Sequence, residues 1–227
     1  MTESRVVALV AAHDEADRVG DTVGALASIE GVHEVVVVDD GSRDATAAVA
    51  LAAGATVLRV PRRVGKGRAV EGALGRLPSA PVWLLADADL GGTASHLAPL
   101  IELVVDGRAD LAIAVFPPLT GGGLGRVKRF AGRAIRLLSR FRPEEPLSGQ
   151  RALNATCLAA CRPLATGFGL ETGMTIDAAR AGFRVVEVPL DGLSHRPTGR
   201  SLRGYAHRGR QGIDIVRAVA ARAIRIR

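Results

Sequence analysis

Continuous apolar runs alternate, in the first part of the chain, with segments whose apolar residues recur at helical spacing. The runs cover residues 5–11, 34–39, 55–60 and 81–86. The segments with helical spacing cover residues 19–26, 44–53 and 66–77. Apolar runs of this length are typical of strands that are buried on both faces of a parallel sheet. The alternation therefore predicts an α/β fold with a Rossmann-like, mostly parallel sheet and helices on both faces.

The pattern becomes less regular after residue 90. We predict further strands at 109–116, 150–154 and 183–188. We predict further helices at 95–105, 126–141, 155–161, 171–181 and from about 210 to the end of the chain. A glycine-rich break at 120–123 predicts a loop. We treat the 227 residues as one domain in three parts, 1–90, 91–195 and the basic arm 196–227.

The composition fits an ordered protein in a reducing compartment. With 227 residues and 48% hydrophobic content, the chain can bury a substantial core. Cys157 and Cys161 do not complete a zinc site, so we expect two structural thiols in a cytoplasmic protein. The sequence has neither an apolar run of about 18 residues nor a signal-peptide pattern. We therefore expect a soluble protein or one peripheral to the inner face of a membrane.

The net charge of +7 is concentrated in two segments. Residues 196–227 hold nine arginines and one acid, and residues 125–142 hold seven basic residues and no acid. Such segments suit anionic partners, namely diphosphates, lipid headgroups or nucleic acid. Aromatic residues make up only 3% of the chain and no nucleic-acid recognition motif is present. We therefore do not expect a nucleic-acid partner.

Polar residues follow each of the first four predicted strands, where ligands bind in sheets of this kind. Asp87 and Asp89 stand two residues apart at the end of the fourth strand. Two carboxylates on a tight turn can approach a hard cation that bridges two phosphates, and this cation offsets the charge on a departing diphosphate. The alternative is a solvated turn whose acids cap a helix. The position after the fourth strand favours Mg²⁺ or Mn²⁺.

Three other positions could contact a nucleotide or its acceptor. Asp39 and Asp40 offer acceptors to the N–H groups of a base and to ribose hydroxyls. Lys66 lies in a Gly-Lys-Gly string without the P-loop pattern, which excludes an ATPase of that class. Lys66 is then either a phosphate contact or an ordinary lysine at a helix start. Glu171 could orient an acceptor or take its proton, or it could stabilise the start of its helix.

Motifs along nearly the whole chain resemble those of family 2 glycosyltransferases with the GT-A fold. The motifs are VAAHDE at 10–15, VVDDGS at 37–42, GKG at 65–67, DADL at 87–90, SGQR at 148–151, GFGLE at 167–171, EVP at 187–189 and HRPTGRS at 195–201. Within the family the chain is most similar to enzymes of the dolichol-phosphate mannosyltransferase type and to glucosyl-3-phosphoglycerate synthases. Ala11 and Asp14 depart from the family's usual proline and asparagine, which leaves the donor base open.

The resemblance implies a UDP-sugar or GDP-sugar donor, with Mg²⁺ or Mn²⁺ as cofactor. It implies that the donor contacts Ala12, Glu15, Asp39, Asp40, Lys66, Asp87, Arg196 and Arg200. It implies that Asp87, Asp89 and His195 hold the metal ion. Asp89 and Glu171 are then the expected catalytic residues. A protein that binds a nucleotide sugar without transferring it is the distant alternative.

We expect the acceptor to be an anion. The first candidate is a polyprenyl phosphate or another acceptor near a membrane, and the alternative is soluble 3-phosphoglycerate. The membrane candidate depends on two amphipathic segments with apolar and basic sides. The apolar stripe of the first segment comprises Val127, Phe130, Ala131, Ala134, Leu137, Leu138 and Phe141. In the last helix, the apolar arc comprises Ile213, Val216, Ala220 and Ile224. The basic arc of the same helix comprises Arg210, Arg217, Arg222 and Arg225. These faces either pack on the core or dock on an anionic membrane surface. The oligomeric state stays open.

Overall fold

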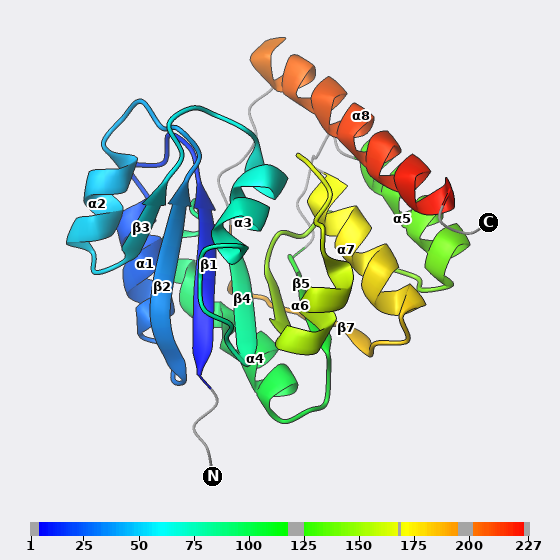
Figure 1. The fold of residues 1–227 in the computed structure, drawn as a ribbon, viewed down its shortest axis with the longest axis horizontal. Coiled ribbons are helices and arrows are strands. Elements are labelled where there is room, and N and C mark those ends of the chain that lie inside the picture. Colours follow the sequence, from blue (N-terminus) through cyan, green and yellow to red (C-terminus); the bar gives the residue numbers. More distant parts are fainter. Residues whose placement is uncertain (1–4, 118–124, 168, 195–201, 225–227) are drawn as a thin grey trace.

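Seven strands form one sheet in the order β3-β2-β1-β4-β6-β5-β7 (Figure 1). The computed structural model describes residues 5–117, 125–167, 169–194 and 202–224, without the side chains of 126 and 202–211. The strands are β1 (Val6–Ala12), β2 (Val32–Asp39), β3 (Thr56–Arg59), β4 (Val82–Asp87), β5 (Leu111–Val115), β6 (Arg151–Asn154) and β7 (Val185–Pro189). The helices are α1 (Val19–Ala27), α2 (Thr46–Ala52), α3 (Lys66–Leu74), α4 (Ala98–Val105), α5 (Gly125–Ser139), α6 (Ala155–Cys161), α7 (Gly169–Arg180) and α8 (Leu202–Ile224), with the 3-10 helix η1 (Gly91–Leu97) before α4.

The sheet is mostly parallel, as the apolar runs predict. Only β6 runs against its neighbours, because it pairs antiparallel with both β4 and β5. The other pairs, β1 with β2, β1 with β4, β2 with β3 and β5 with β7, are parallel. An antiparallel strand begins at the edge where its parallel neighbours end. The start of β6 is therefore at the same edge as the end of β4, and this brings Gln150 to the site described below.

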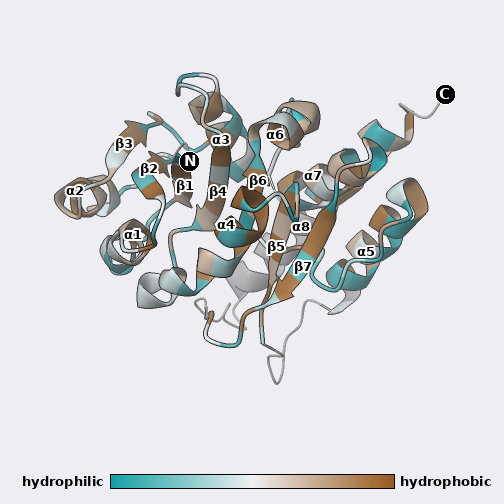
Figure 2. Cartoon of the chain, turned by 90° about the horizontal axis from the view of Figure 1, so that it is seen from below, coloured by the Kyte–Doolittle hydropathy of each residue, from teal (hydrophilic) through white to brown (hydrophobic). Residues whose placement is uncertain are grey.

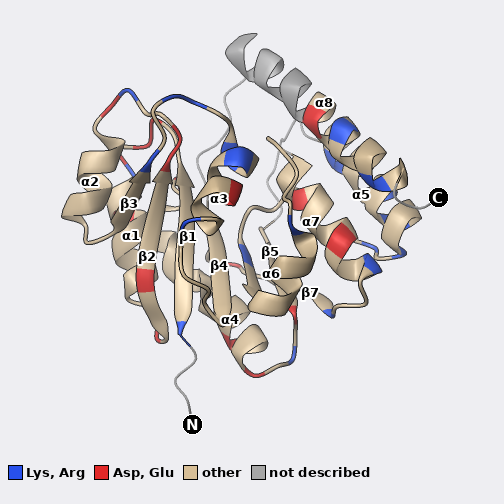
Figure 3. Cartoon of the chain, viewed as in Figure 1, with Lys and Arg blue, Asp and Glu red and all other residues tan. Residues whose placement is uncertain are grey.

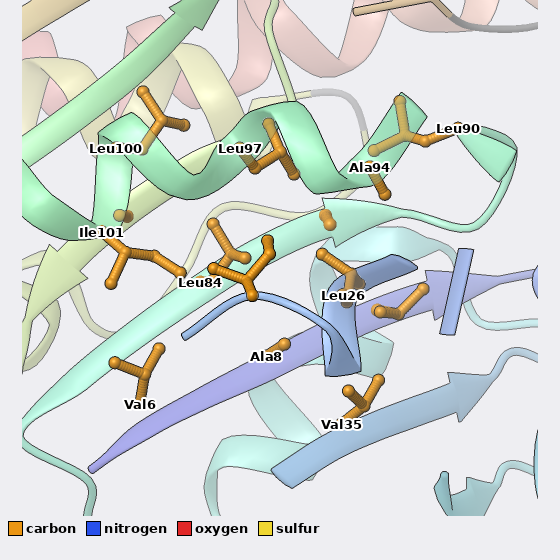
Figure 4. Packing of buried hydrophobic residues seen from close by; sticks show 14 of the residues in the cluster. Val6, Ala8, Leu26, Val35, Leu84, Leu90, Ala94, Leu97, Leu100 and Ile101 are labelled. Carbon is orange, nitrogen blue, oxygen red and sulfur yellow. The ribbon is translucent and has the colours of Figure 1, made fainter. Parts of the chain in front are cut away.

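Helices cover both faces of the sheet. On one face α1, η1 and α4 pack on the central strands, and Figure 4 shows Leu26 and Leu97 over Ala8 and Leu84. On the other face α3, α6 and α7 form a second apolar cluster, which includes Trp83 of β4. Figure 2 shows the sheet between these layers. The two-sided burial accounts for the unbroken apolar runs in β1, β2 and β4.

Both cysteines are buried and free in the second cluster. A hydrogen bond with Cys161 and burial raise the pKa of Cys157, so this thiol stays protonated at neutral pH. The thiols are therefore structural, as the sequence predicts.

Helices α5 and α8 pack outside α7 rather than on the sheet (Figure 1). Arg222 anchors α8, because its Nε lies 2.8 Å from Oδ2 of Asp177 and 3.2 Å from the carbonyl oxygen of Gly173. Its side chain is only 7% exposed. Arg222, which the sequence places on the basic arc of the last helix, therefore packs on α7 and does not face a partner. Within the described residues, no helix is both long enough and apolar enough to cross a membrane.

Two predicted boundaries also need correction. Helix α8 begins at Leu202 and not near residue 210. Residues 91–97 form a 3-10 turn, so the α-helix predicted at 95–105 begins at Ala98. The segment 202–209 contains two glycines and lacks an apolar stripe, which explains why the pattern misses it.

Replacing Arg222 with alanine should lower the free energy of unfolding by about 3 kcal/mol, because Asp177 would be left half-buried without its cation. Urea denaturation measures this change. Arg108→Ala is the matched control, since Arg108 pairs with Asp106 at the surface with 60% of its side chain exposed, and it should change stability by at most about 0.5 kcal/mol. Equal losses in the two variants would contradict the anchoring role of Arg222.

Candidate functional site

The ends of β3, β2, β1 and β4 lie in a row along one edge of the sheet, with the side chains of Asp39 and Asp87 on opposite faces. Arg59 pairs with Asp39, Asp39 pairs with Ala12, and Asp87 pairs with Ala11 in the strand register. Neighbouring strands are about 4.8 Å apart, so Asp39 and Asp87 lie on strands about 10 Å apart. Figure 3 shows acidic and basic residues gathered in the loops that follow these strands. The sequence-predicted residues 12, 39 and 87 thus lie at one edge.

Gln150 and Lys66 hold the carboxylate of Asp87 from two sides. The amide of Gln150 donates from Nε2 to Oδ2 of Asp87 at 2.9 Å, and its Oε1 accepts the backbone N–H of Asp87 at 3.0 Å. The ammonium of Lys66 lies 2.6 Å from Oδ1 of Asp87. Both oxygens of Asp87 are therefore oriented by neighbouring side chains.

Lys66 also reaches Glu171, whose Oε1 lies 2.8 Å from Nζ. Lys66 is the first residue of α3 and Glu171 is in the first turn of α7, so this contact ties two helix starts together. Burial alone would lower the pKa of Lys66, but Asp87 and Glu171 outweigh burial and raise it above its usual value. Lys66 is thus a charged bridge and not an ordinary lysine at a helix start.

Close packing explains the two glycines that matter most around this bridge. A Cβ on Gly67 would lie 2.1 Å from the carbonyl oxygen of Ala165, in the loop that precedes α7. A Cβ on Gly149 would lie 2.5 Å from Oδ2 of Asp87 and 2.5 Å from Nζ of Lys66. The Gly-Lys-Gly string therefore serves packing between α3 and the 163–167 loop, and the absence of a side chain at Gly149 lets its backbone lie close to Asp87 and Lys66.

Helix α1 holds the turn that carries Asp89. Arg18 donates from Nη1 to the carbonyl oxygen of Asp89 at 3.0 Å. The hydroxyl of Thr22 donates to the carbonyl oxygen of Ala88 and accepts the N–H of Gly91, both at 2.8 Å. The backbone of the turn is thereby fixed on one side. Neither Arg18 nor Thr22 was predicted from the sequence.

Asp39 and Asp40 differ in their surroundings although they are adjacent. The carboxylate of Asp40 accepts the N–H groups of Val64 at 2.7 Å and Gly65 at 2.8 Å, so it orders the loop that leads to Lys66. Asp39 is fully buried, and its Oδ1 accepts the N–H of Ser42 at 2.9 Å. Its Oδ2 accepts no hydrogen bond, although Nε of Arg59 lies 3.3 Å away. A buried acceptor in this state is costly unless a ligand donates to it.

The loop after β1 is fixed by the loop after β2. Asp14 has a φ of +55°, a conformation that aspartate and asparagine tolerate better than most residues. Its backbone N–H donates to Oγ of Ser42, and its Oδ1 accepts the N–H of Arg43 at 2.8 Å. Glu15 donates its backbone N–H to Oγ1 of Thr46 at 2.8 Å. Asp14 can therefore fill the place of the family's asparagine, and Glu15 is held beside the row of strand ends.

The described residues offer oxygen ligands for a hard cation. Asp87 and Asp89 supply carboxylates, which Mg²⁺ and Mn²⁺ prefer, and the side chain of Asp87 is 32% exposed. Among the residues that the structure describes, no three acidic, histidine or cysteine side chains cluster as a metal site. Magnesium is commonly held by one or two carboxylates together with substrate phosphates, so two aspartates fit this mode. The predicted residues His195, Arg196 and Arg200 lie outside the described residues.

Known proteins share both the sequence pattern and the fold. Residues 7–155 match the family described as glycosyl transferase family 2. Glycosyltransferase AglJ of Haloferax volcanii is 29% identical over 192 residues, which cover 83% of this chain and 63% of that protein. The glucosyl-3-phosphoglycerate synthase of Mycobacterium tuberculosis is 32% identical over 219 residues, which cover 84% of this chain and 66% of that protein. The chain thus spans about two thirds of the length of these curated relatives.

Solved structures of that mycobacterial synthase superpose on most of the chain. A crystal structure with Mn²⁺, uridine diphosphate and phosphoglyceric acid has a TM-score of 0.76 at 27% identity and covers 96% of this chain and 78% of its own. A second structure, with Mg²⁺ and uridine diphosphate, has a TM-score of 0.76 at 25% identity. Its match covers 96% of this chain and 79% of its own. The predicted GT-A fold is therefore confirmed.

Gly149→Ala should lower the free energy of unfolding by about 1–3 kcal/mol, because the added Cβ forces Asp87 and Lys66 apart. Chemical denaturation monitors the loss. Gly24→Ala in α1 is the control, since a Cβ there meets nothing within 4 Å. That control should be neutral or stabilising by up to about 1 kcal/mol. If both variants were equally stable, the close approach at Gly149 would not constrain the site.

Proposed function

Because this chain belongs to glycosyl transferase family 2, as its match over residues 7–155 shows, we propose that it transfers a hexose from a UDP-sugar to a small phosphorylated acceptor. The observation that carries the proposal is the bridge of Lys66 between Asp87 and Glu171 at the carboxyl edge of the sheet. It joins a carboxylate suited to a metal ion with a cation suited to phosphate and an acid on the acceptor side. A turn with a purely structural role would not require all three of these groups at one place.

The donor nucleotide lies along the strand ends in this proposal. The unsatisfied Oδ2 of Asp39 accepts an N–H of the base, and this contact removes the cost of a buried acceptor. Ala12 and Glu15 flank the nucleoside, and Asp40 acts indirectly by ordering the loop before Lys66. Uracil is favoured over guanine because the mycobacterial synthase structures contain uridine diphosphate. Arg196 and Arg200 remain proposed phosphate contacts.

The diphosphate is the part of the donor that needs positive charge. Asp87 and Asp89 would hold Mg²⁺ or Mn²⁺, with His195 as a further proposed ligand, and a bound divalent cation neutralises charge that develops on a departing diphosphate. Lys66 stays charged at neutral pH because its pKa is raised. Its ammonium can donate to the same phosphate oxygens. Gln150 keeps the carboxylate of Asp87 in the orientation that this requires.

Glu171 is the proposed contact for the sugar or the acceptor. Its carboxylate is 94% buried and is held by Lys66, so its position is fixed by packing. A fixed acceptor of hydrogen bonds can align a hydroxyl for attack, and alignment alone supplies much of an enzyme's rate. An anionic acceptor also benefits from the basic residues around this half of the chain.

The names of the relatives favour the phosphoglycerate acceptor over the polyprenyl phosphate that we expected first. Glucosyl-3-phosphoglycerate synthases recur among the relatives at 31–32% identity. Structures of the mycobacterial synthase contain phosphoglyceric acid or glycerol 3-phosphate. The name of the Haloferax relative states no acceptor. A phosphorylated three-carbon acid is therefore the acceptor class that we propose, and a membrane-proximal acceptor is the second candidate.

Uridine diphosphate with Mn²⁺ should raise the melting temperature of the protein more than either alone, because a ligand that binds only the folded state stabilises it. Asp89→Asn should abolish the manganese-dependent part of this rise and leave the part due to uridine diphosphate alone. Asp106→Asn, at an exposed surface pair, is the control. A full manganese effect in Asp89→Asn would refute the proposed metal role.

Release of uridine diphosphate from UDP-glucose should depend on 3-phosphoglycerate and not on a short polyprenyl phosphate. Glu171→Gln should lower this rate about 100-fold, because the acceptor loses its alignment. It should keep the thermal shift with uridine diphosphate and manganese. Release with only the polyprenyl phosphate would select the second candidate. Binding without release for any acceptor would indicate a non-catalytic binding protein.

A further inference from the structure

Exposed large hydrophobic side chains gather on two helices at one end of the molecule. Five of the seven within the described residues lie on α5 and α8. They are Phe130 (43% exposed), Leu137 (78%), Ile213 (54%), Val216 (51%) and Ile224 (75%). The other two, Leu51 and Val105, lie on α2 and at the end of α4. In Figures 1 and 2, α5 and α8 lie at the end of the molecule opposite α1 and α2. We call the outward faces of the two helices the α5/α8 surface.

The outward face of α5 combines arginines with two of these side chains. Arg129, Arg133, Arg136 and Arg140 are exposed and recur at spacings of four, three and four, so they form one row along the helix and its end. Phe130 and Leu137 are seven residues apart and flank this row. The inward face carries Ala131, Ala134 and Ile135, which are buried. The predicted apolar stripe of this helix is therefore divided, and its two largest exposed members do not pack on the core.

The described part of α8 presents an apolar face in the same way. Ile213, Val216, Ala220 and Ile224 are exposed, as the predicted arc requires, while Ile215, Ala218 and Arg222 are buried. The only acid of this helix, Asp214, contacts the backbone of the loop before α7, since a Cβ on Gly167 would lie 2.0 Å from its Oδ2. Of the exposed residues described on α8, Arg217 alone is charged, and it is basic. Figure 3 shows basic residues on both helices.

We propose that the α5/α8 surface docks on an anionic lipid membrane. Arginines beside large apolar side chains match the boundary between anionic headgroups and acyl chains, because the guanidinium groups meet phosphates while the apolar groups enter the layer beneath. Residues 125–142 contain no acid that would be repelled by such a surface. The helices pack on each other and on α7, so the two faces belong to neighbouring elements.

Other partners fit this surface less well. In a symmetric dimer the same face meets itself, so the arginine row of one copy would approach that of the other and repel it. A nucleic-acid backbone would pair with the arginines but would leave the isoleucine and leucine side chains without an apolar partner. Charge and apolar exposure together thus favour a lipid surface.

Docking at this surface would orient the site without entering it. Both α5 and α8 pack on α7, and α7 carries Glu171 in its first turn. Docking would then hold α7, and with it Glu171, near the membrane, whichever acceptor the protein uses. The proposal therefore does not depend on the proposed activity.

Sedimentation with lipid vesicles tests the proposal. The full chain should bind vesicles of phosphatidylcholine with about a third phosphatidylglycerol, and pure phosphatidylcholine much less. The paired change Arg133→Gln and Arg136→Gln should weaken binding at least about tenfold, since each basic residue near an anionic surface contributes about fivefold. The paired change Leu137→Ser and Ile224→Ser should weaken binding to a similar extent. Leu51→Ser with Val105→Ser is the matched control and should bind like the wild type.

Circular dichroism and the thermal shift with uridine diphosphate and manganese verify that each variant is folded, and both should match the wild type. Equal binding to the two vesicle types, or no binding to either, would overturn the proposal. Unchanged binding of both α5/α8 variants would do the same. Light scattering that shows a dimer dissolved by Leu137→Ser and Ile224→Ser, in a protein that ignores vesicles, would assign the surface to a second copy of the chain.

Discussion

The contact on which the site depends is the ammonium of Lys66 between two carboxylates. Asp87 and Glu171 belong to segments 84 residues apart, and their charges would repel without a cation between them. Lys66 satisfies both at distances of 2.6 and 2.8 Å and draws the starts of α3 and α7 together. The close packing of Gly67 against Ala165 and of Gly149 against Asp87 and Lys66 accompanies this approach. The residue that assembles the site is therefore the same one that we propose as a phosphate contact.

The rest of the fold supports this contact from a distance. Arg222 fixes α8 on α7, and α7 in turn carries Glu171. On the other side, Thr22 and Arg18 of α1 hold the turn of Asp89 through its backbone. Asp87 and Glu171 are thus held by Lys66 at the start of α3, and the backbone of the turn that carries Asp89 is held from the side of α1. An arrangement of this kind limits the movement of the carboxylates and so lowers the cost of ordering them around a ligand.

The sheet could be predicted from the sequence because the central strands are buried on both faces. Their sequences are therefore unbroken apolar runs. The sequence also identified Asp39, Lys66, Asp87 and Glu171, since charged residues at strand and helix ends stand out against such runs. It did not assign a role to Gln150, because contact with Asp87 requires knowing that β6 lies beside β4 in the opposite direction. The order of strands is a property of the long-range packing and leaves no local pattern.

Asp40 and Arg222 show the same limit at the level of single side chains. Both are charged residues in segments that suit a ligand, yet Asp40 binds the amides of Val64 and Gly65 and Arg222 binds Asp177. The start of α8 was missed because residues 202–209 lack the apolar periodicity on which helix prediction depends. The groups that surround a charged side chain determine whether it stabilises the fold or can bind a ligand. These groups come from distant parts of the sequence, so only the folded structure identifies them.

The reversed direction of β6 has a consequence for how such a protein can change. β5 and β6 are neighbours, and Ile113 pairs with Arg151, so the segment that connects them leaves the sheet and returns to it at one edge. This segment carries all of α5 and ends beside Asp87. The two ends of this segment are close together because β5 and β6 pair as in a hairpin. The length of the segment between them does not change this. A change within this segment can therefore leave the pairing of β5 with β6, and with it the rest of the sheet, in place.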